Sequence, residues 1–261
     1  VGILMRCQSQ YLVFGILSVG MVLIPIFMPP ISQSVDYHKF ADQRVYFGIP
    51  NFLNVVSNVF IFFPGLIGLI LLIRSRELLL QVTFIRSLER WPYFILFLSV
   101  IMASLASTYY HLAPDNARLV WDRFPIAIGI VTLLSTVLIE RINTNIGFIL
   151  LPFLILFGAG SVIYWDWSEQ SGLGNLNYYI VVQLYSILSI ILFSKYFFSR
   201  YTGGAGIYVV IILYAFAKLA ETLDHEIYSL GKVISGHSVK HLLVGLAVFQ
   251  IIRTLQNRRP L

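Results

Sequence analysis

The sequence predicts an all-α, polytopic membrane protein. Of its 261 residues, 58% are hydrophobic and only 11% are charged, whereas soluble domains carry about 25% charged residues. Apolar runs close to the ~20 residues that a helix needs to cross a bilayer recur along the whole chain. Backbone amides inside lipid must be paired within their own segment, so each run is predicted to be a helix.

Eight such runs are predicted, in this order: 11–28, 52–73, 92–112, 120–139, 145–164, 177–197, 206–226 and 237–254. The short connections between them leave no room for a soluble module. The first run is interpreted as a membrane anchor, because "MPPISQSVDY" after it lacks a small-x-small cleavage pattern. We therefore divide the chain into an N-terminal anchor helix with its cytoplasmic start, 1–33, and a membrane domain, 34–261.

Cysteine usage and charge exclude several classes of site. Cys7 is the only cysteine, which rules out an internal disulfide and a cysteine-rich metal site. The formal net charge of +6 is interpreted as a topology signal of a membrane protein, and no nucleic-acid partner is predicted.

The distribution of basic residues predicts the orientation. Eleven of the 18 lysines and arginines fall on the side that carries both predicted termini, and seven fall on the other. The positive-inside rule then places both termini in the cytoplasm. Trp165, Trp167, Tyr178 and Tyr179 flank one outer loop as an interfacial aromatic belt. With this threading all five histidines share the outer face: His38, His111, His225, His237 and His241.

Histidine spacing predicts a metal site at that face. His237 and His241, in "SGHSVKHLL", are four residues apart, so both imidazoles lie on one side of a helix and can reach one ion. A third imidazole, from His111 on another helix, completes a tripod. Three neutral nitrogens with an open fourth position describe a catalytic zinc site, and zinc lowers the pKa of bound water to about 7.

The base for such a site must come from outside the histidine motif. Ser238 stands where H-E-x-x-H zinc proteases carry glutamate, which argues against that class. Asp122 begins the helix after His111 at a similar depth, where it can accept a proton from water and deliver it to a leaving amine. Ser107, one turn deeper than His111, can hold that water or a developing oxyanion.

Structural interpretations of the same residues remain open at this stage. A single interfacial histidine is commonly just an amphipathic residue, and an H-x-x-x-H pair alone is equally compatible with no metal. Asp122 followed by Arg123 is compatible with a helix start and a local salt bridge. What favours function is that costly ionisable groups gather at one end of three membrane helices.

Other polar residues receive smaller roles. Asp115, in "PDN", is predicted to cap a turn, and His38 and His225 are predicted to be peripheral. Glu221 is predicted to pair with Lys218. Glu221 and Asp224 are also candidates for orienting a metal-bound histidine, by accepting a hydrogen bond from the imidazole nitrogen that does not bind the metal.

Five residues together resemble a known family. The pattern S-x-x-x-H, an aspartate eleven residues after that histidine, and a late H-x-x-x-H resemble the alkaline ceramidase family and its wider superfamily, which includes adiponectin-receptor-like membrane hydrolases. The residues are Ser107, His111, Asp122, His237 and His241. "SGHSVKH" and "GIPNFLNVVSN" also resemble the bacterial and plant ceramidase-type branch, and the resemblance spans roughly 37–255.

The resemblance implies a seven-helix bundle over 52–254, to which 11–28 is additional. It implies zinc held by His111, His237 and His241, with Asp122 as general acid/base and Ser107 supporting the oxyanion. The implied reaction is hydrolysis of the amide of a ceramide-like lipid to a long-chain base and a fatty acid, in a lipid-accessible cavity.

The family's calcium site is matched only in part. Alkaline ceramidases bind calcium through an acidic loop before the first core helix, which here reads "DYHKFADQRVYFGIPN". Asp36, Asp42 and Asn51 offer oxygen ligands, but the expected glutamates are missing, and calcium takes six to eight oxygens. The choice between ceramide and another N-acyl lipid therefore stays open.

The leading hypothesis is a multi-pass, zinc-dependent amidohydrolase that takes a lipid amide from the bilayer and has its active site near the extracytoplasmic face. The alternative is a non-enzymatic membrane receptor or sensor that keeps the metal for structure. A transporter or channel ranks last, because it needs ionisable groups at mid-membrane along a path; Lys218 and Glu221 are the only candidates in the run 206–226, and the rest of the bundle is nearly uncharged.

Overall fold

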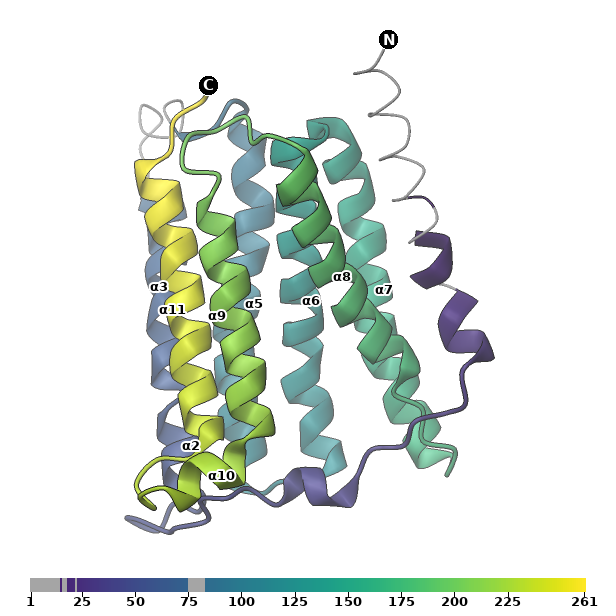
Figure 1. Cartoon of the computed structure of the whole chain (residues 1–261), viewed down its shortest axis with the longest axis vertical. Helices are drawn as coiled ribbons and strands as arrows, with labels where there is room; N and C mark the ends of the chain where they lie inside the picture. The colour runs from purple at the N-terminus through teal and green to yellow at the C-terminus, as the bar shows by residue number, and fades with distance from the viewer. Residues whose placement is uncertain (1–14, 16–17, 22, 75–82) are drawn as a thin grey trace.

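The computed structural model describes residues 15, 18–21, 23–74 and 83–261, and in these ranges every regular element is a helix (Figure 1). This confirms the predicted all-α class. The elements are η1 (Val35–His38), α2 (Phe52–Val56), α3 (Val59–Arg74), η2 (Ser87–Glu89), α5 (Arg90–Leu112), α6 (Asn116–Arg141), α7 (Thr144–Gln170), α8 (Asn177–Tyr196), α9 (Gly206–Thr222), α10 (Asp224–Ser229) and α11 (Gly236–Asn257).

Six helical segments are long and apolar enough to cross a membrane: Phe52–Arg74, Ser87–Leu112, Asn116–Arg141, Thr144–Gln170, Asn177–Tyr196 and Gly236–Asn257. They support a multi-pass membrane protein. The predicted segment 206–226 is divided, because α9 ends at Thr222 after 17 residues and α10 follows.

The additional N-terminal helix is seen only in part. Residues 18–21 and 23–27 are helical, and the rest of the predicted anchor, with Cys7, lies largely outside the described residues. The structure therefore tests neither the anchor interpretation nor the division at residue 33.

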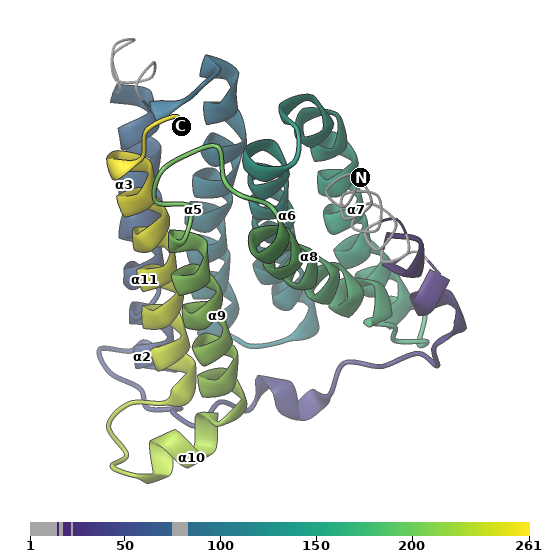
Figure 2. The ribbon, with the colours of Figure 1, turned by 45° about the horizontal axis from the view of Figure 1, so that its top comes forward.

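The helices form two groups that meet along α5 and α6. Helix α6 packs against α5, α7 and α8, whereas α11 packs against α3 and α9. Helices α8 and α9 approach each other at one end of the bundle and diverge towards the other (Figures 1 and 2). The end where they diverge carries η1, α2 and α10, together with the last turn of α5 and the first turns of α6 and α11.

Side-chain caps explain where several helices begin. The Asp115 side chain accepts a hydrogen bond of 2.7 Å from the backbone N–H of Arg118, so the residue predicted to cap a turn is the N-cap of α6. Asn143 caps α7 and Ser235 caps α11 in the same way. Each cap pairs a backbone donor that the helix itself leaves unsatisfied.

A buried ionic network holds the opposite end of the bundle. Arg258, just after α11, pairs with Glu140 of α6 and stacks 4.2 Å from the ring centroid of Tyr201. The Tyr201 hydroxyl donates to Glu89 at the start of α5. The ends of α5, α6 and α11 are thus joined by charged groups that have partners, as burial of charge requires.

Close packing of α3 against α11 depends on Gly245. A Cβ at this position would lie 2.0 Å from the carbonyl oxygen of Phe60, a backbone atom that cannot rotate away. We expect Gly245→Ala to destabilise the protein by about 1–3 kcal/mol, the usual effect of overpacking, and to lower its Tm in detergent. Gly160→Ala is the matched control, since a Cβ there meets nothing within 4 Å. Equal Tm values for the two variants would contradict this account of the packing.

Candidate metal centre

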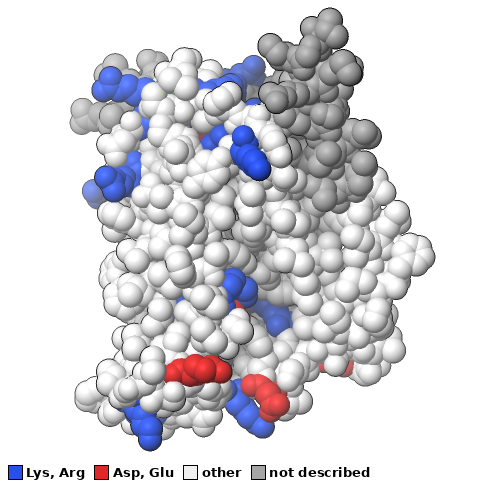
Figure 3. Space-filling model, in the orientation of Figure 1, with Lys and Arg blue, Asp and Glu red and all other residues white. Residues whose placement is uncertain are grey.

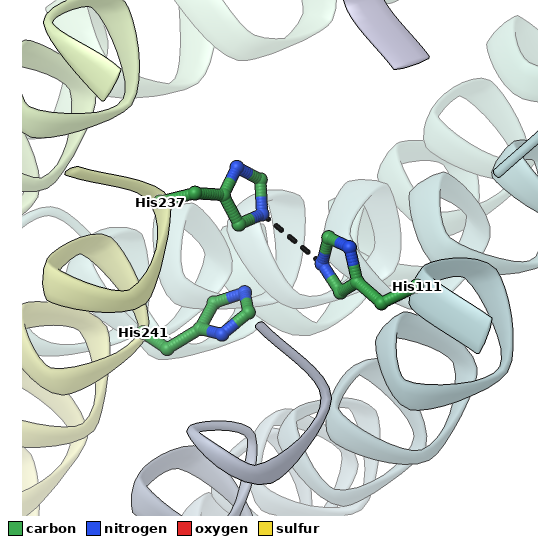
Figure 4. A group of neighbouring side chains, drawn as sticks. All are labelled: His111, His237 and His241. Carbon is green, nitrogen blue, oxygen red and sulfur yellow. Dashed lines mark hydrogen bonds between the residues drawn. The ribbon is translucent and has the colours of Figure 1, made fainter. Parts of the chain in front are cut away.

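Three buried imidazoles come together at the end where α8 and α9 diverge. His111 lies in the last turn of α5, and His237 and His241 lie in the first turns of α11 (Figure 4). The Nε2 atoms of His111 and His237 are 3.1 Å apart, and one ligand nitrogen from each of the three residues lies within 4.8 Å of the others. The predicted grouping is confirmed, and the cluster can hold a metal ion.

Residues before α3 fix the position of His111. Phe40 is buried, and its ring centroid lies 4.6 Å from that of His111 and 4.7 Å from that of His237. The Asn51 side-chain amide donates a 2.9 Å hydrogen bond to the backbone carbonyl of His111. Phe40 shields two imidazoles from solvent, while Asn51 pairs a carbonyl that the end of α5 leaves free.

Ser57 determines which nitrogen of His241 is available to a metal. Its Oγ lies 2.8 Å from His241 Nδ1 and 3.3 Å from the carbonyl oxygen of Asn54. The carbonyl can only accept, so the hydroxyl donates to Asn54 and accepts from the Nδ1–H of His241. His241 Nε2 then carries a lone pair, the state that a metal requires.

The start of α11 is held by buried polar groups. The side-chain oxygen of Asn54 accepts hydrogen bonds from the hydroxyls of Ser235 and Ser238, at 3.0 and 2.9 Å. Asp224 accepts from the backbone N–H of His237 at 2.7 Å and from that of Ala41 at 2.9 Å. Ser238, which replaces the protease glutamate, is therefore a structural residue.

These contacts correct one prediction. Asp224 was a candidate for orienting an imidazole through its ring nitrogen, but its carboxylate holds the backbone of His237 instead. The residue that contacts a ring nitrogen and orients an imidazole is Ser57, which lies beside His241 Nδ1. Sequence reasoning missed it. "NVVSN" offered no periodic signal that singles out its serine.

Unpartnered nitrogens provide a test of whether a metal fits. Within the part of the chain that the structure describes, His111 Nδ1 and His241 Nε2 are buried without a hydrogen-bond partner, although buried polar atoms nearly always have one. A metal held by the three imidazoles gives His241 Nε2 its missing partner. Zinc–nitrogen bonds of about 2.0–2.1 Å need ligand atoms only slightly farther apart than the 3.1 Å between His111 and His237. The residues present fit a three-histidine metal site.

Asp122 and Ser107 are buried near this cluster. The Ser107 hydroxyl contacts the Asp122 carboxylate, and both residues line one cavity together with His241. Among the described residues Asp122 forms no ion pair with Arg123, so the local salt bridge considered from the sequence is wrong. The carboxylate predicted as the base instead faces the cavity.

The cavity has a volume of about 230 Å³ and runs into the bundle between α5, α6, α8, α9 and α11. One end is polar and carries Ser107, Asp122, Lys218, Glu221, Lys240 and His241. The remainder is mostly aliphatic, with Leu96, Ile130, Ile190, Val210 and Ile251 on its walls. Figure 3 shows a hollow with recessed basic groups on the face where α8 and α9 diverge.

The predicted calcium ligands are engaged by protein partners. Asp36 is exposed and pairs with Lys39 at 2.8 Å. Both oxygens of the buried Asp42 accept from Arg44, at 2.8 and 2.7 Å, while the Asn51 amide serves His111. Burial raises the pKa of Asp42, but the Arg44 hydrogen bonds outweigh it and hold that pKa below its ordinary value. Asp36 and Asp42 thus pair with basic side chains of the same loop, and calcium binding stays a prediction.

The remaining predictions concern neighbouring residues. His38 bonds to Tyr110 and Asn116, and His225 lies 3.1 Å from the carbonyl of Lys39; both are peripheral to the cluster, as predicted. The Lys218–Glu221 pair is confirmed at 2.6 Å. Lys240 joins it at 2.7 Å from the second oxygen of Glu221, a contact between α9 and α11 that spacing did not indicate.

Comparison with known proteins gives no family assignment, because no protein-family model and no curated protein matches this sequence. Function is therefore inferred from the site.

Ser57→Ala tests the assignment of the His241 nitrogens. We expect zinc affinity to fall about 10–100-fold, the usual effect of removing a group that orients a metal ligand, with the protein still folded. Chelator competition on the purified protein measures this. Ser229→Ala is the control, because Ser229 is exposed and bonds only within α10. An unchanged zinc affinity in Ser57→Ala would show that Ser57 does not select the nitrogen.

Proposed function

We propose that this protein is a zinc-dependent, integral-membrane amidohydrolase that cleaves the amide bond of a lipid. The observation that supports it best is the three-histidine cluster beside a buried carboxylate, at the polar end of a largely aliphatic cavity. The resemblance of the same five residues to the alkaline ceramidases points to the same chemistry and names ceramide or a related N-acyl lipid as substrate.

His111, His237 and His241 would hold the ion. Three neutral imidazoles suit zinc, which is usually held by three protein ligands in catalytic sites and keeps the fourth position open. When bound, zinc acts as a Lewis acid and makes hydroxide available at neutral pH.

Asp122 carries the proton transfers in this proposal. Hydrolysis forms a bond between the water oxygen and the carbonyl carbon and breaks the bond from that carbon to nitrogen. Asp122 takes the proton that water loses and gives it to the departing amine nitrogen, so acid and amine leave without net proton uptake by the protein. Ser107 donates its one hydroxyl proton to the ionised Asp122 carboxylate and orients it. Once Asp122 has taken the proton from water, the Ser107 hydroxyl is free to donate to the developing oxyanion instead.

The cavity suits a substrate that remains partly in the bilayer. Its aliphatic walls accept acyl chains, and the hollow between α8 and α9 gives them a lateral entry. In this proposal α9 is the seventh membrane helix, the termini face the cytoplasm, and the site lies near the extracytoplasmic side.

Asp122→Asn is the decisive variant. Asparagine keeps the shape of the side chain but cannot exchange a proton, so we expect kcat to fall by about 10²–10⁴-fold while zinc stays bound. Turnover of N-acyl lipids by the purified, zinc-loaded protein is followed by mass spectrometry, with zinc content measured on the same sample. The control is Asp166→Asn on α7, a half-buried residue outside the cavity that bonds to Gln170.

Two results would contradict the proposal. Wild-type activity in Asp122→Asn would remove Asp122 from the chemistry. Wild-type protein that binds zinc at full occupancy, yet hydrolyses neither ceramides nor N-acyl amino acids, would favour the alternative of a receptor or sensor with a structural metal.

A further inference from the structure

Arg123 is a buried cation with an unusual environment. It follows Asp122 on α6, is only 5% exposed, and lines the same cavity. Its guanidinium carbon lies 4.2 Å from the ring centroid of Trp165, 4.9 Å from that of Tyr179 and 5.5 Å from that of Tyr37. The three rings hold the guanidinium in place from three separate segments of the chain.

The protein provides hydrogen-bond acceptors for only some of the N–H groups of this guanidinium. Nη2 donates to the side-chain oxygen of Gln33, and the Tyr37 hydroxyl lies beside the group. Among the described residues Nη1 is buried without a hydrogen-bond partner, and no carboxylate there lies within ion-pair distance. A guanidinium offers five N–H donors in a fork that matches a carboxylate. Aromatic rings stabilise its charge, but they do not satisfy those in-plane donors.

Neighbouring charges leave an excess of positive charge at the polar end of the cavity. Lys218 and Lys240 share the single carboxylate of Glu221, at 2.6 and 2.7 Å. Among the residues that line the cavity, three cations face two carboxylates once Arg123 and Asp122 are included. Glu169, which bonds to Trp165 and Gln33 beside Arg123, does not line it. Because unpaired buried charge is costly, this composition favours an anionic group on the bound molecule.

The position of Arg123 indicates which part of the substrate carries that anion. In the proposed reaction, on which this step rests, Asp122 protonates the amine nitrogen. Arg123 lines the same cavity as Asp122, so its guanidinium can reach the amine portion of the substrate, while the aliphatic wall receives the acyl chain. A ceramide has no anion in its amine portion, so its hydroxyls can accept a hydrogen bond from Nη1 but cannot neutralise the charge of the guanidinium.

We infer that Arg123 anchors a carboxylate-binding subsite, and that the preferred substrates are N-acyl amino acid lipids, whose amine portion carries a carboxylate. The guanidinium binds the carboxylate of the amine portion and holds the amide beside Asp122. Arg123 is thus a specificity-determining residue.

A matched pair of amides tests the inference. N-oleoylglycine and N-oleoylethanolamine share the acyl chain and the amide and differ in a carboxylate against a hydroxyl. With zinc-loaded, full-length protein we expect a kcat/KM at least about tenfold higher for N-oleoylglycine, since hydrogen bonds to charged groups are the stronger ones. Arg123→Gln should abolish this preference, mainly by raising KM for the acid. Arg118→Gln, on the same helix but paired with Asp115 outside the cavity, should keep it.

A binding measurement separates the two proposals. Equilibrium binding of labelled N-oleoylglycine to the metal-free protein is competed with oleate and with N-oleoylethanolamine. Weak competition by both compounds, together with loss of binding in Arg123→Gln, supports the carboxylate-binding subsite. If these results are obtained and no amide is hydrolysed, the subsite stands and the proposed hydrolase function fails. Oleate competing as well as N-oleoylglycine would assign Arg123 to the fatty-acid carboxylate and overturn the inference. Equal kcat/KM values of the wild-type protein for the two amides would overturn the inference about Arg123 and leave the proposed hydrolase intact. This comparison uses the wild-type protein only, so it does not depend on whether a variant folds.

Discussion

The site depends on how the first turn of α11 is fixed against the rest of the bundle. A Cβ on Gly236 would lie 2.1 Å from the carbonyl oxygen of Ala220, so α11 begins in direct contact with the backbone of α9. Asp224 then holds the N–H of His237, and Asn54 holds the hydroxyls around it. Because His237 and His241 are one turn apart, fixing this turn aims both imidazoles at His111. The backbone and hydroxyl groups around the three imidazoles pair with Asn51, Asn54 and Asp224, so the turn is held without using the imidazole nitrogens that are left for a metal.

The cavity follows from the grouping of the helices. Helix α6 joins the α7–α8 pair to α5, while α9 stays with α11, so the space between α8 and α9 is left without a helix to fill it. Side chains facing that space are aliphatic at depth and charged near the metal cluster. One arrangement therefore supplies an apolar volume, a polar end beside the metal cluster, and a hollow between α8 and α9.

Sequence periodicity predicted the helices well because each apolar run has to satisfy its own backbone. It also identified His111, His237 and His241, since i, i+4 spacing fixes the face of a helix and the chain reversals bring these ends together. It could not place contacts made by irregular segments. Phe40, Asn51 and Ser57 reach the cluster from turns and a short helix, where no period determines direction. Asn51 and Asp42 looked like calcium ligands because oxygen chemistry is visible in a sequence, whereas their protein partners are not.

The same geometry limits how a reactant can approach the metal site. Phe40 covers His111 and His237, and of the three histidines only His241 lines the cavity. A molecule entering between α8 and α9 therefore meets the cluster from the side of His241, where Asp122 and Ser107 also lie. Any open ligand position that serves such a molecule has to face this side. Among the described residues Asp122 forms no ion pair, so its carboxylate is buried at a cost on the cavity side of the three-imidazole cluster. The proposed reaction would give this buried carboxylate a role as proton carrier.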